Sequence, residues 1–568
     1  MVSLVGAGAV PSGRVLLGSR KHSLPVVPRR GNPSLRPPAG SDSASSVEWE
    51  ALPPVVPRWG ARGFNAGAEL AWLHCPAVKY GFLINHERCI GCHACTVACK
   101  AENDIPIGDF RTWVKYQENG TFPEIKRHFA VLRCNHCDDA PCVSICPVNA
   151  LEKRSDGIVD VDRDACIGCR ACMQACPYDA IYLNEAKGAV EKCHFCAHRV
   201  DKGLEPACVV VCPVEAIVTG DLDDPSSPIA KLIAERETLV RRPEQGTGPN
   251  VYYLGVEPTM LEPGVVARPE TYIWSDRPDD KPEKWPLSLP VIQDARIVLD
   301  VGHKVEWGWH VAAYLVTKGI AAGAAVLAPF AAALGLTGFG YDYFPEILAL
   351  VFILITNALL VDDLTRPTKF FRMVTRPNWD SWLVKGGVVL TVFSMLVTAG
   401  LGLRLLGMDA AADGLRYAES VAGLATAGYT AFLFAQCKGR DLWEGKLLLP
   451  HLLVQSALCG SVCFLPFAGD KAMPLAVIAA VSAVLHGLFA LNERYGKHPT
   501  DNARQAAAFL DVVRLGSTRP FRDGLIIGVG ITVLAAFAAP AVAFIPALVG
   551  LYMYKWAYVR AAQLPPLS

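Results

Sequence analysis

The chain has 568 residues, more than one hydrophobic core usually organises, so two or more domains are expected. Its 54 basic and 54 acidic side chains cancel, which gives no indication of nucleic-acid binding. The composition is uneven: the first 300 residues are polar and rich in cysteine, whereas residues 305–568 are dominated by Ala, Leu, Val, Gly and Phe.

Residues 1–76 form a leader rich in Pro, Gly, Arg and Ser, with no periodic apolar face. This composition predicts disorder. The pair Arg29-Arg30 is typical of a twin-arginine export signal, but residues 31–46 contain no apolar stretch after it. We therefore expect no export signal in the leader.

Residues 77–300 carry four cysteine quartets, and seventeen of the twenty cysteines fall between Cys75 and Cys212. The first and third quartets have spacings of two, two and three residues, the second has four residues in its middle gap, and the fourth has eleven. Proline follows directly in three of them. The quartets are Cys89, Cys92, Cys95, Cys99; Cys134, Cys137, Cys142, Cys146; Cys166, Cys169, Cys172, Cys176; and Cys193, Cys196, Cys208, Cys212.

This spacing is typical of 4Fe-4S clusters. Three thiolates from one tight turn bind a corner of a cubane, and the fourth, three residues on, points to the other cluster of a pair. Zinc ribbons also use paired C-x2-C motifs, but a zinc site does not explain why the fourth cysteine is followed by proline. Disulfide scaffolds scatter their cysteines along loops. We predict four 4Fe-4S clusters, with all sixteen cysteines as iron ligands.

Short β-branched runs at residues 157–162 and 180–183 predict the strands of two ferredoxin-like units, an α+β fold. From residue 79 to about residue 265, the chain resembles the four-cluster iron–sulfur subunit of the DMSO reductase superfamily of molybdenum enzymes. The resemblance implies a cross-pairing, in which the first quartet pairs with the fourth and the second with the third. It implies the sets Cys89, Cys92, Cys95, Cys212; Cys193, Cys196, Cys208, Cys99; Cys134, Cys137, Cys142, Cys176; and Cys166, Cys169, Cys172, Cys146.

Residues 301–568 contain eight apolar stretches of the length that crosses a bilayer, which predicts an all-α bundle of eight transmembrane helices. The stretches are 308–334, 344–361, 383–404, 419–436, 446–467, 473–492, 523–539 and 541–559. Lys and Arg gather in the loops on the side of the cysteine domain, whereas the opposite loops hold only Arg404, Arg416 and Lys471. The positive-inside rule then predicts a multi-pass protein of the inner membrane with its iron–sulfur domain in the cytoplasm.

This half resembles the polysulfide reductase (NrfD-like) membrane-subunit family, on the segments Trp307-Gly-Trp-His, Asp363-Leu-Thr-Arg-Pro and Gly428-Tyr-Thr-Ala-Phe-Leu. The resemblance implies a quinone site that includes a tyrosine of the fourth span. Ionisable residues inside spans are costly and usually functional, and these fall mainly at the boundary on the cysteine side. We predict His310, Tyr429, His451 and Asp362 as the quinone site, although any one of them could instead anchor a helix end. Lys318, near the middle of the first span, has no assigned role.

The two resemblances imply that the chain is the electron-transfer and membrane-anchor component of a molybdopterin oxidoreductase complex. Its expected partners are membrane lipid, quinone and a catalytic subunit. The chain has no segment for a molybdopterin, so a separate catalytic subunit must act on the substrate, and this chain performs at most the quinone half-reaction. We expect sulfite oxidation with electrons flowing into quinone. A polysulfide, thiosulfate or DMSO-type reductase, a proton-translocating complex and a purely structural anchor are the alternatives. The sequence leaves the substrate, the direction of electron flow and the type of quinone open.

Overall fold

The computed structural model describes residues 78–266, 292, 294–302, 304–333 and 338–568. The chain divides into Met1–Leu73 and a compact unit, His74–Ser568, to which all described residues belong. The predicted leader and Cys75 lie outside the described residues.

The cysteine-rich part is built on a four-stranded sheet in the order β8-β1-β10-β9. Its strands are β1 (Tyr80–Asn85), β8 (Ile217–Asp221), β9 (Thr238–Leu239) and β10 (Val251–Leu254). Strand β1 pairs with β10 in parallel and with β8 in antiparallel orientation. Phe82, Ile84 and Tyr253 are fully buried at its centre, so the alternating apolar residues of β1 anchor this half.

A second sheet and two hairpins complete the cysteine-rich part. The sheet has the order β11-β2-β3, formed by β2 (Thr112–Asn119), β3 (Lys126–Arg133) and β11 (Ala295–Leu299). The hairpins pair β4 (Leu151–Lys153) with β5 (Val159–Val161), and β6 (Ile181–Asn184) with β7 (Ala189–Lys192). Strands β5 and β6 coincide with the two predicted runs. Short helices follow the cysteine loops: α1 (Ala94–Asn103), α2 (Pro141–Ile145), α3 (Ala171–Ala175), α4 (Ala197–Val200) and α5 (Ala207–Val210), with α6 (Pro228–Glu235) against the first sheet.

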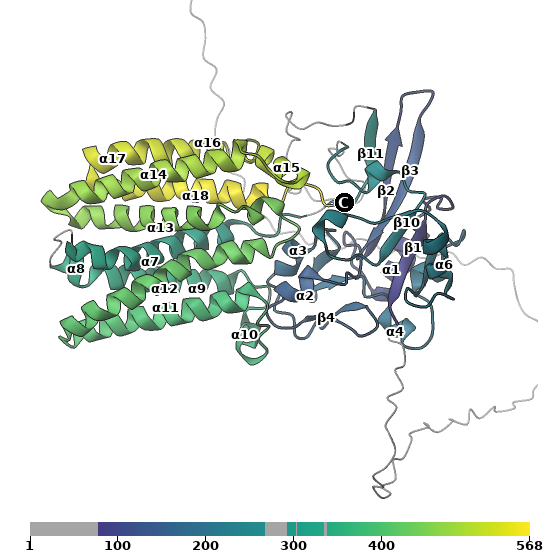
Figure 1. Cartoon of the computed structure of the whole chain (residues 1–568), viewed down its shortest axis with the longest axis horizontal. Helices are drawn as coiled ribbons and strands as arrows, with labels where there is room; N and C mark the ends of the chain where they lie inside the picture. Colours follow the sequence, from purple (N-terminus) through teal and green to yellow (C-terminus); the bar gives the residue numbers. More distant parts are fainter. Residues whose placement is uncertain (1–77, 267–291, 293, 303, 334–337) are drawn as a thin grey trace, which may run out of the picture. The chain divides into compact units, whose positions relative to one another are not determined.

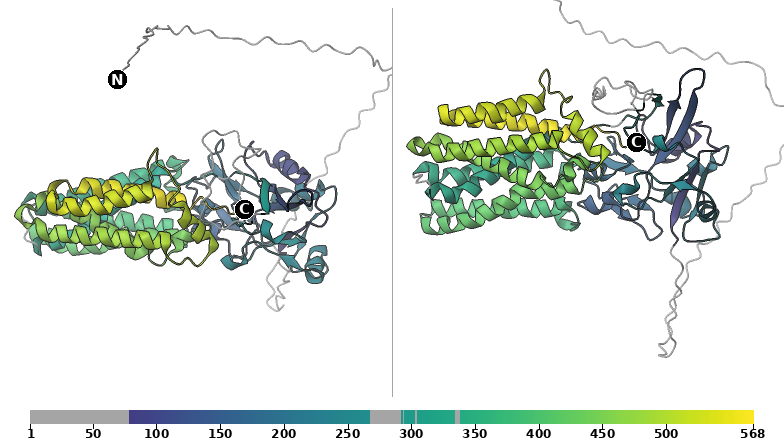
Figure 2. Two further views of the ribbon diagram at one scale, coloured as in Figure 1. Left: turned by 90° about the horizontal axis from the view of Figure 1, so that it is seen from above. Right: turned by 45° about the horizontal axis from the view of Figure 1, so that its top comes forward.

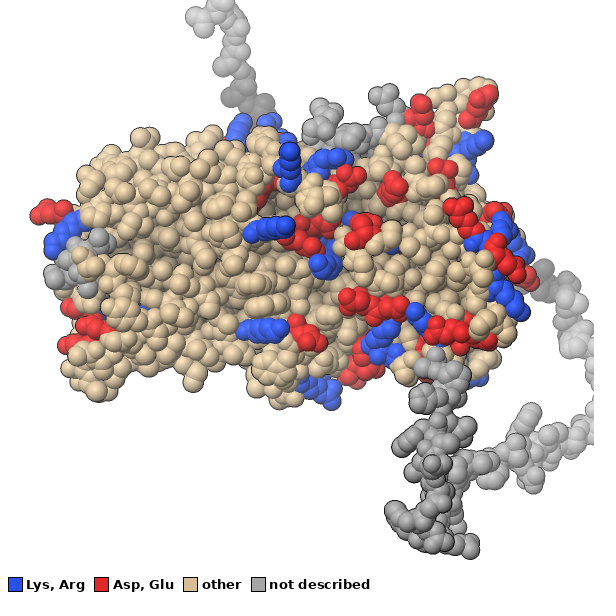
Figure 3. All heavy atoms as spheres, in the orientation of Figure 1, with Lys and Arg blue, Asp and Glu red and all other residues tan. Residues whose placement is uncertain are grey.

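The second half is helical, and its long helices run alongside one another (Figures 1 and 2). They are α7 (Trp309–Ala333), α9 (Phe344–Asp362), α11 (Trp382–Leu405), α12 (Asp409–Ala435), α13 (Leu448–Phe464), α14 (Ala472–Tyr495), α16 (Pro520–Leu525) continuing through a π-helical turn into α17 (Thr532–Ala538), and α18 (Phe544–Ala561). Shorter helices α8 (Phe339–Asp342), α10 (Arg372–Thr375) and α15 (Asp501–Phe509) lie in the connections. On the face shown in Figure 3, charged side chains are nearly absent over the long helices.

Within the described residues, seven of the eight predicted spans coincide with helices long and apolar enough to cross a membrane. The predicted α+β domain followed by a helical membrane domain is therefore confirmed. The remaining span corresponds to α12, a helix of 27 residues whose first eleven residues include four charged ones. Its crossing of the membrane stays a prediction.

Candidate metal centres and membrane site

Each cysteine loop contains a residue in the left-handed conformation. His93, His136, Arg170 and Phe195 have φ between 46° and 62°. His93 and Arg170 lie two residues before the third cysteine of their quartets, whereas the other two directly precede a second cysteine. A left-handed residue reverses the chain direction locally. The turn therefore curls around a centre toward which successive cysteine side chains converge.

The fourth cysteine of each quartet lies with another quartet's loop. One cavity is lined by Cys89, Cys92, Cys95 and Cys212; a second by Cys99, Cys193, Cys196 and Cys208; and a third by Cys134, Cys137, Cys142 and Cys176. The remaining four, Cys146, Cys166, Cys169 and Cys172, lie within electrostatic reach of one another. The structure thus brings together the four sets that the family resemblance implies.

The chemistry of these sets fits iron–sulfur clusters. All nineteen cysteines among the described residues are free. Burial raises the pKa of Cys95 to about 11 and that of Cys137 to about 12, so thiolates there need a nearby positive charge. The iron of a bound cluster would supply that charge and hold these ligands deprotonated. The described residues contain no group of three or more His, Cys, Asp or Glu side chains spaced to hold a single metal ion.

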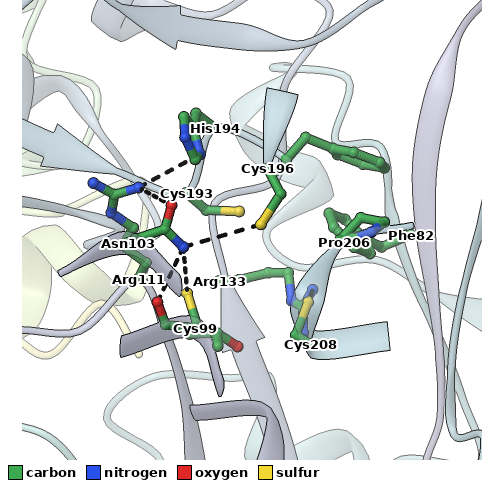
Figure 4. A pocket seen from close by; sticks show the side chains of 12 residues that line it. Phe82, Cys99, Asn103, Arg111, Arg133, Cys193, His194, Cys196, Pro206 and Cys208 are labelled. Carbon is green, nitrogen blue, oxygen red and sulfur yellow. Dashed lines mark hydrogen bonds between the residues drawn. The ribbon is translucent and has the colours of Figure 1, made fainter. Parts of the chain in front are cut away.

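The set with Cys208 has additional polar partners (Figure 4). The Asn103 amide nitrogen lies 3.7 Å from Cys99 Sγ and 4.0 Å from Cys196 Sγ. Arg133, fully buried, donates from Nη1 to Cys208 Sγ at 3.4 Å and stacks over the Phe82 ring. Burial opposes the Arg133 charge, but the neighbouring cysteine sulfurs, Cys208 first, raise the pKa of Arg133. These donors stabilise negative charge on sulfur.

The third quartet's loop touches the membrane helices. Arg170, next to Cys169, donates from Nη2 to Asp363 Oδ1 at 2.7 Å, and its Nη1 lies 3.9 Å from Glu306 Oε2. Trp307 Nε1 donates to Cys169 O at 3.4 Å. Burial raises the pKa of Glu306 to about 7, an effect that Arg170 opposes. The set that includes Cys169 is therefore joined directly to the start of α7 and the end of α9.

The connection between α9 and α11 makes further contacts with the cysteine loops: Asn378, just before α11, donates to Cys146 O at 2.8 Å. Arg366, after α9, donates from Nη1 to Arg163 O at 2.7 Å and to Cys166 O at 3.4 Å. These contacts use backbone carbonyls of the cysteine loops. The cysteine-rich part is thus held by the connections that follow α9 and precede α11.

Two of the four predicted quinone-site residues lie together at this junction. His310 Nε2 lies 3.0 Å from Asp362 Oδ2, and His310 Nδ1 lies 3.5 Å from Asp363 Oδ1. The His310 ring also stacks on Trp309, with ring centroids 3.8 Å apart. Asp363 therefore bridges His310 to Arg170 and the cysteine loop.

Tyr429 lies deeper and is reached along α7. His310, Tyr314 and Lys318 are four residues apart, so they form one stripe on that helix. Lys318 is buried, and its Nζ lies 4.6 Å from the centroid of the Tyr429 ring. It donates to Ala427 O at 3.2 Å and to Thr430 Oγ1. Gly386 leaves the space that the Tyr429 ring fills.

His451 belongs to a different group. It lies on α13 and contacts Glu493 and His486 of α14, and no interaction found among the described residues joins it to His310, Tyr429 or Asp362. The structure does not bring it together with the other three predicted residues. In the sequence, His310 and His451 look alike, because both are histidines near a helix end. The partners that distinguish them come from other helices.

Several charged residues are buried in the helical bundle, and two of them, Arg404 and Arg416, were expected in loops but lie in α11 and α12. Arg416 Nε donates to Glu346 Oε1 at 2.6 Å, with both side chains 1% exposed, on α12 and at the start of α9. Glu419, one turn along, is buried, and within the described part of the chain its Oε1 has no hydrogen-bond partner. Lys555 is buried in α18. Each is a charged residue in or beside an apolar stretch, which is the signal that could have identified it.

Comparison with known families agrees with this architecture. Residues 80–101 match a 4Fe-4S binding domain, residues 125–222 a 4Fe-4S dicluster domain, and residues 298–468 the family "Polysulphide reductase, NrfD". The cysteine-rich part is 43% identical over 206 residues to a subunit of the tetrathionate reductase of Salmonella typhimurium, covering 35% of this chain and 82% of that subunit.

Two further relatives have similar coverage. A subunit of the polysulfide reductase of Wolinella succinogenes is 42% identical over 179 residues, 31% of this chain and 94% of that subunit. The arsenate respiratory reductase iron–sulfur subunit ArrB of a Shewanella species is 37% identical over 225 residues, 31% of this chain and 96% of that protein. The chain therefore belongs to the iron–sulfur subunits of the DMSO, tetrathionate and polysulfide reductase type, continued in the same polypeptide by a multi-pass membrane domain of the NrfD family.

Proposed function

We propose that this chain passes electrons between a separate molybdenum-containing catalytic subunit and membrane quinone, through four 4Fe-4S clusters held by the sixteen quartet cysteines. The observation that carries the proposal is the contact chain from Cys169 through Arg170 and Asp363 to His310. It joins one cysteine set directly to a protonatable pair at the membrane boundary. A quinone carbonyl placed there would meet a hydrogen-bond donor next to the electron source.

The opposite end of the cysteine domain supports docking of the catalytic subunit. Cys92 is exposed, and large apolar side chains around it are exposed as well: Ile90 at 56%, Val97 at 64% and Val210 at 62%. Helices α1 and α5, which carry Val97 and Val210, pack against each other. An exposed apolar patch is typical of a protein–protein interface. This one surrounds the set formed by Cys89, Cys92, Cys95 and Cys212, so electrons could enter or leave there.

The direction of electron flow separates two versions of this function. The sequence-based expectation favoured sulfite oxidation, whereas the relatives named above are reductases. Their names support the opposite direction, in which quinol is oxidised and the catalytic subunit reduces an oxidised sulfur, arsenic or related compound. Oxidation of sulfite stays a prediction. A gene neighbour that encodes the catalytic subunit would identify the substrate.

The number of clusters has a direct test. Four cubanes contain about 16 iron and 16 sulfide per chain. Elemental analysis of the purified chain measures both. Zinc in place of iron, or about half the iron, would contradict the assignment of all four sets.

The quinone site is tested by Tyr429→Phe, which removes the hydroxyl and keeps the ring, and by His310→Leu, which removes both ring nitrogens. Losing one donor to a developing negative charge should cost about 2–4 kcal/mol, or about 30- to 1,000-fold in quinol turnover. Tyr417→Phe, an exposed tyrosine of the same helix as Tyr429, is the matched control. Reduction of the clusters by dithionite and their reoxidation by a dye should be unchanged. Normal quinol turnover in both variants would place the site elsewhere.

A second candidate function is proton translocation across the membrane. The buried pair Glu346–Arg416 and the unpartnered Glu419 support it, because they extend buried ionisable groups toward the helix ends remote from the cysteine domain. Acidification measured with a pH-sensitive dye in proteoliposomes during quinol turnover tests it. Release of only the protons of quinol oxidation on one side would contradict pumping.

A further inference from the structure

Helices α13, α14 and α18 enclose a chain of protonatable side chains outside the proposed quinone site. His451 Nδ1 lies 2.8 Å from Glu493 Oε1, and His451 Nε2 lies 2.7 Å from His486 Nδ1. The Tyr554 hydroxyl donates to Glu493 Oε2. Gln455 Nε2 lies 2.9 Å from His451 Nε2. Four titratable groups from three helices are thus in direct contact.

The chain runs from a partly accessible end to a closed one. The Glu493 side chain is 11% exposed and lies in the last turn of α14, whereas His451 and His486 are fully buried. At the closed end, His486 Nε2 and Gln455 Oε1 are buried and have no hydrogen-bond partner among the residues that the structure describes. A buried polar atom without a partner is costly in a membrane domain, so a role for it is expected.

The closed end points toward the proposed quinone site. Lys555 of α18 is also buried, and its Nζ lies 5.7 Å from the centroid of the Tyr554 ring, which lies 4.8 Å from that of the His486 ring. Helix α18 also packs against α7, which carries Lys318. Lys318 in turn contacts Thr430 and the Tyr429 ring. An ammonium group buried in a membrane interior is costly, so a lysine there readily passes a proton to a neighbouring acceptor.

Close helix packing makes this connection short. Helices α7 and α13 meet at Gly323 and Gly460, where a Cβ on Gly323 would clash with the backbone at Ser456 and lie 2.7 Å from Gly460 N. One turn away, Gly319, the neighbour of Lys318, faces Cys459 of α13. Small residues at such a crossing let two transmembrane helices approach closely. The helix with Lys318 and the helix with His451 and Gln455 are therefore in direct contact.

We propose that Glu493, His451, His486 and Lys555 form a proton path from the cluster-side boundary, through the second half of the helical domain, to Lys318 beside Tyr429. The family match ends at residue 468, so most of this path lies beyond it. The proposal rests on the proposed quinone chemistry. Oxidation of one quinol releases two electrons, which pass singly to the clusters, and two protons, which leave along the path; reduction of quinone reverses both flows.

The path is tested by Glu493→Gln, which keeps the shape but cannot exchange a proton, and by Lys555→Met, which keeps the length of the side chain. Turnover of quinol with a dye acceptor should fall roughly 100-fold in each, the size of a lost acid–base step. The solvent deuterium isotope effect should rise, because proton transfer becomes rate-limiting. Glu444→Gln and Lys385→Met, which lie outside the path, are the matched controls and should turn over quinol normally.

Small weak acids and bases, such as azide and imidazole, distinguish a lost proton path from a damaged fold. They should restore turnover in Glu493→Gln in proportion to their concentration, while iron content and cluster reoxidation by the dye stay at wild-type values. Wild-type turnover in both variants, or a loss that no weak acid or base restores, would overturn the path. Absence of quinol turnover in the wild-type chain would instead refute the proposed function.

Discussion

At the scale of a single residue, Asn103 is expected to raise the reduction potential of one cluster. Its amide nitrogen faces the sulfurs of Cys99 and Cys196, and its oxygen accepts a hydrogen bond from Arg111. An N–H donor stabilises the reduced cluster, which carries more negative charge on sulfur. Asn103→Ala should remove about 1 kcal/mol of this stabilisation, which is about 40 mV for one electron, and make the potential of one cluster more negative.

A redox titration followed by electron paramagnetic resonance measures this shift for each cluster. Asn119→Ala is the control, because that amide contacts Gln117 on strand β2 and no sulfur. Three clusters should keep their potentials in Asn103→Ala. A uniform shift of all four, or no shift, would show that Asn103 does not act on sulfur directly.

The cysteines were the most predictable residues, because cluster chemistry dictates their spacing along the chain. The membrane histidines were less so. His310 and His451 both lie near helix ends in apolar sequence, yet one contacts Asp362 and the other Glu493. Those partners come from other helices, so sequence position alone gives no means of separating the two groups.

At the scale of helices, the contact between α7 and α13 should be sensitive to one methyl group. A Cβ on Gly323 would overlap the backbone of Ser456. Because backbone atoms cannot rotate away as a side chain does, Gly323→Ala should lower the stability of the membrane domain by about 1–3 kcal/mol. Gly402→Ala in α11, where a Cβ meets no atom within 4 Å, is the control. Thermal unfolding in detergent, monitored by circular dichroism, measures both; equal midpoints would contradict the contact.

Helix α12 shows why hydropathy alone does not decide whether every predicted span crosses the membrane. Two of its charged residues, Arg416 and Glu419, are buried, and Arg416 pairs with Glu346 of α9. Asp413, which is partly exposed, pairs with the buried Arg404 of α11. A hydropathy average treats each helix separately and counts these charges as exposed. The sequence therefore predicted the second part of the helix, whereas its start at Asp409 and the pairing that lets charged residues lie inside a helical bundle required the structure.

At the scale of the whole molecule, the positive residues that predicted its orientation have a second role. Arg366, Lys369 and Arg372 donate to backbone carbonyls of the cysteine domain. Arg376 lies 3.9 Å from Asp162, and Arg440 donates to Gln174. These basic residues thus bind the cysteine domain. Their position follows from docking as well as from the positive-inside rule, so the orientation needs an independent test.

The C-terminus provides that test. Leu567 O accepts a hydrogen bond from Arg241 Nη2 at 2.6 Å, so the end of the chain lies on the side of the cysteine domain. A reporter joined after Ser568 through a flexible linker should therefore report the compartment of the clusters. We expect a fusion to green fluorescent protein to fluoresce and a fusion to alkaline phosphatase to be inactive, because iron is inserted into folded protein in the cytoplasm. Iron content of each fusion, equal to that of the unfused chain, is the control for an intact fold. An active phosphatase with full iron content would place the cluster domain outside the cytoplasm and reverse the predicted orientation.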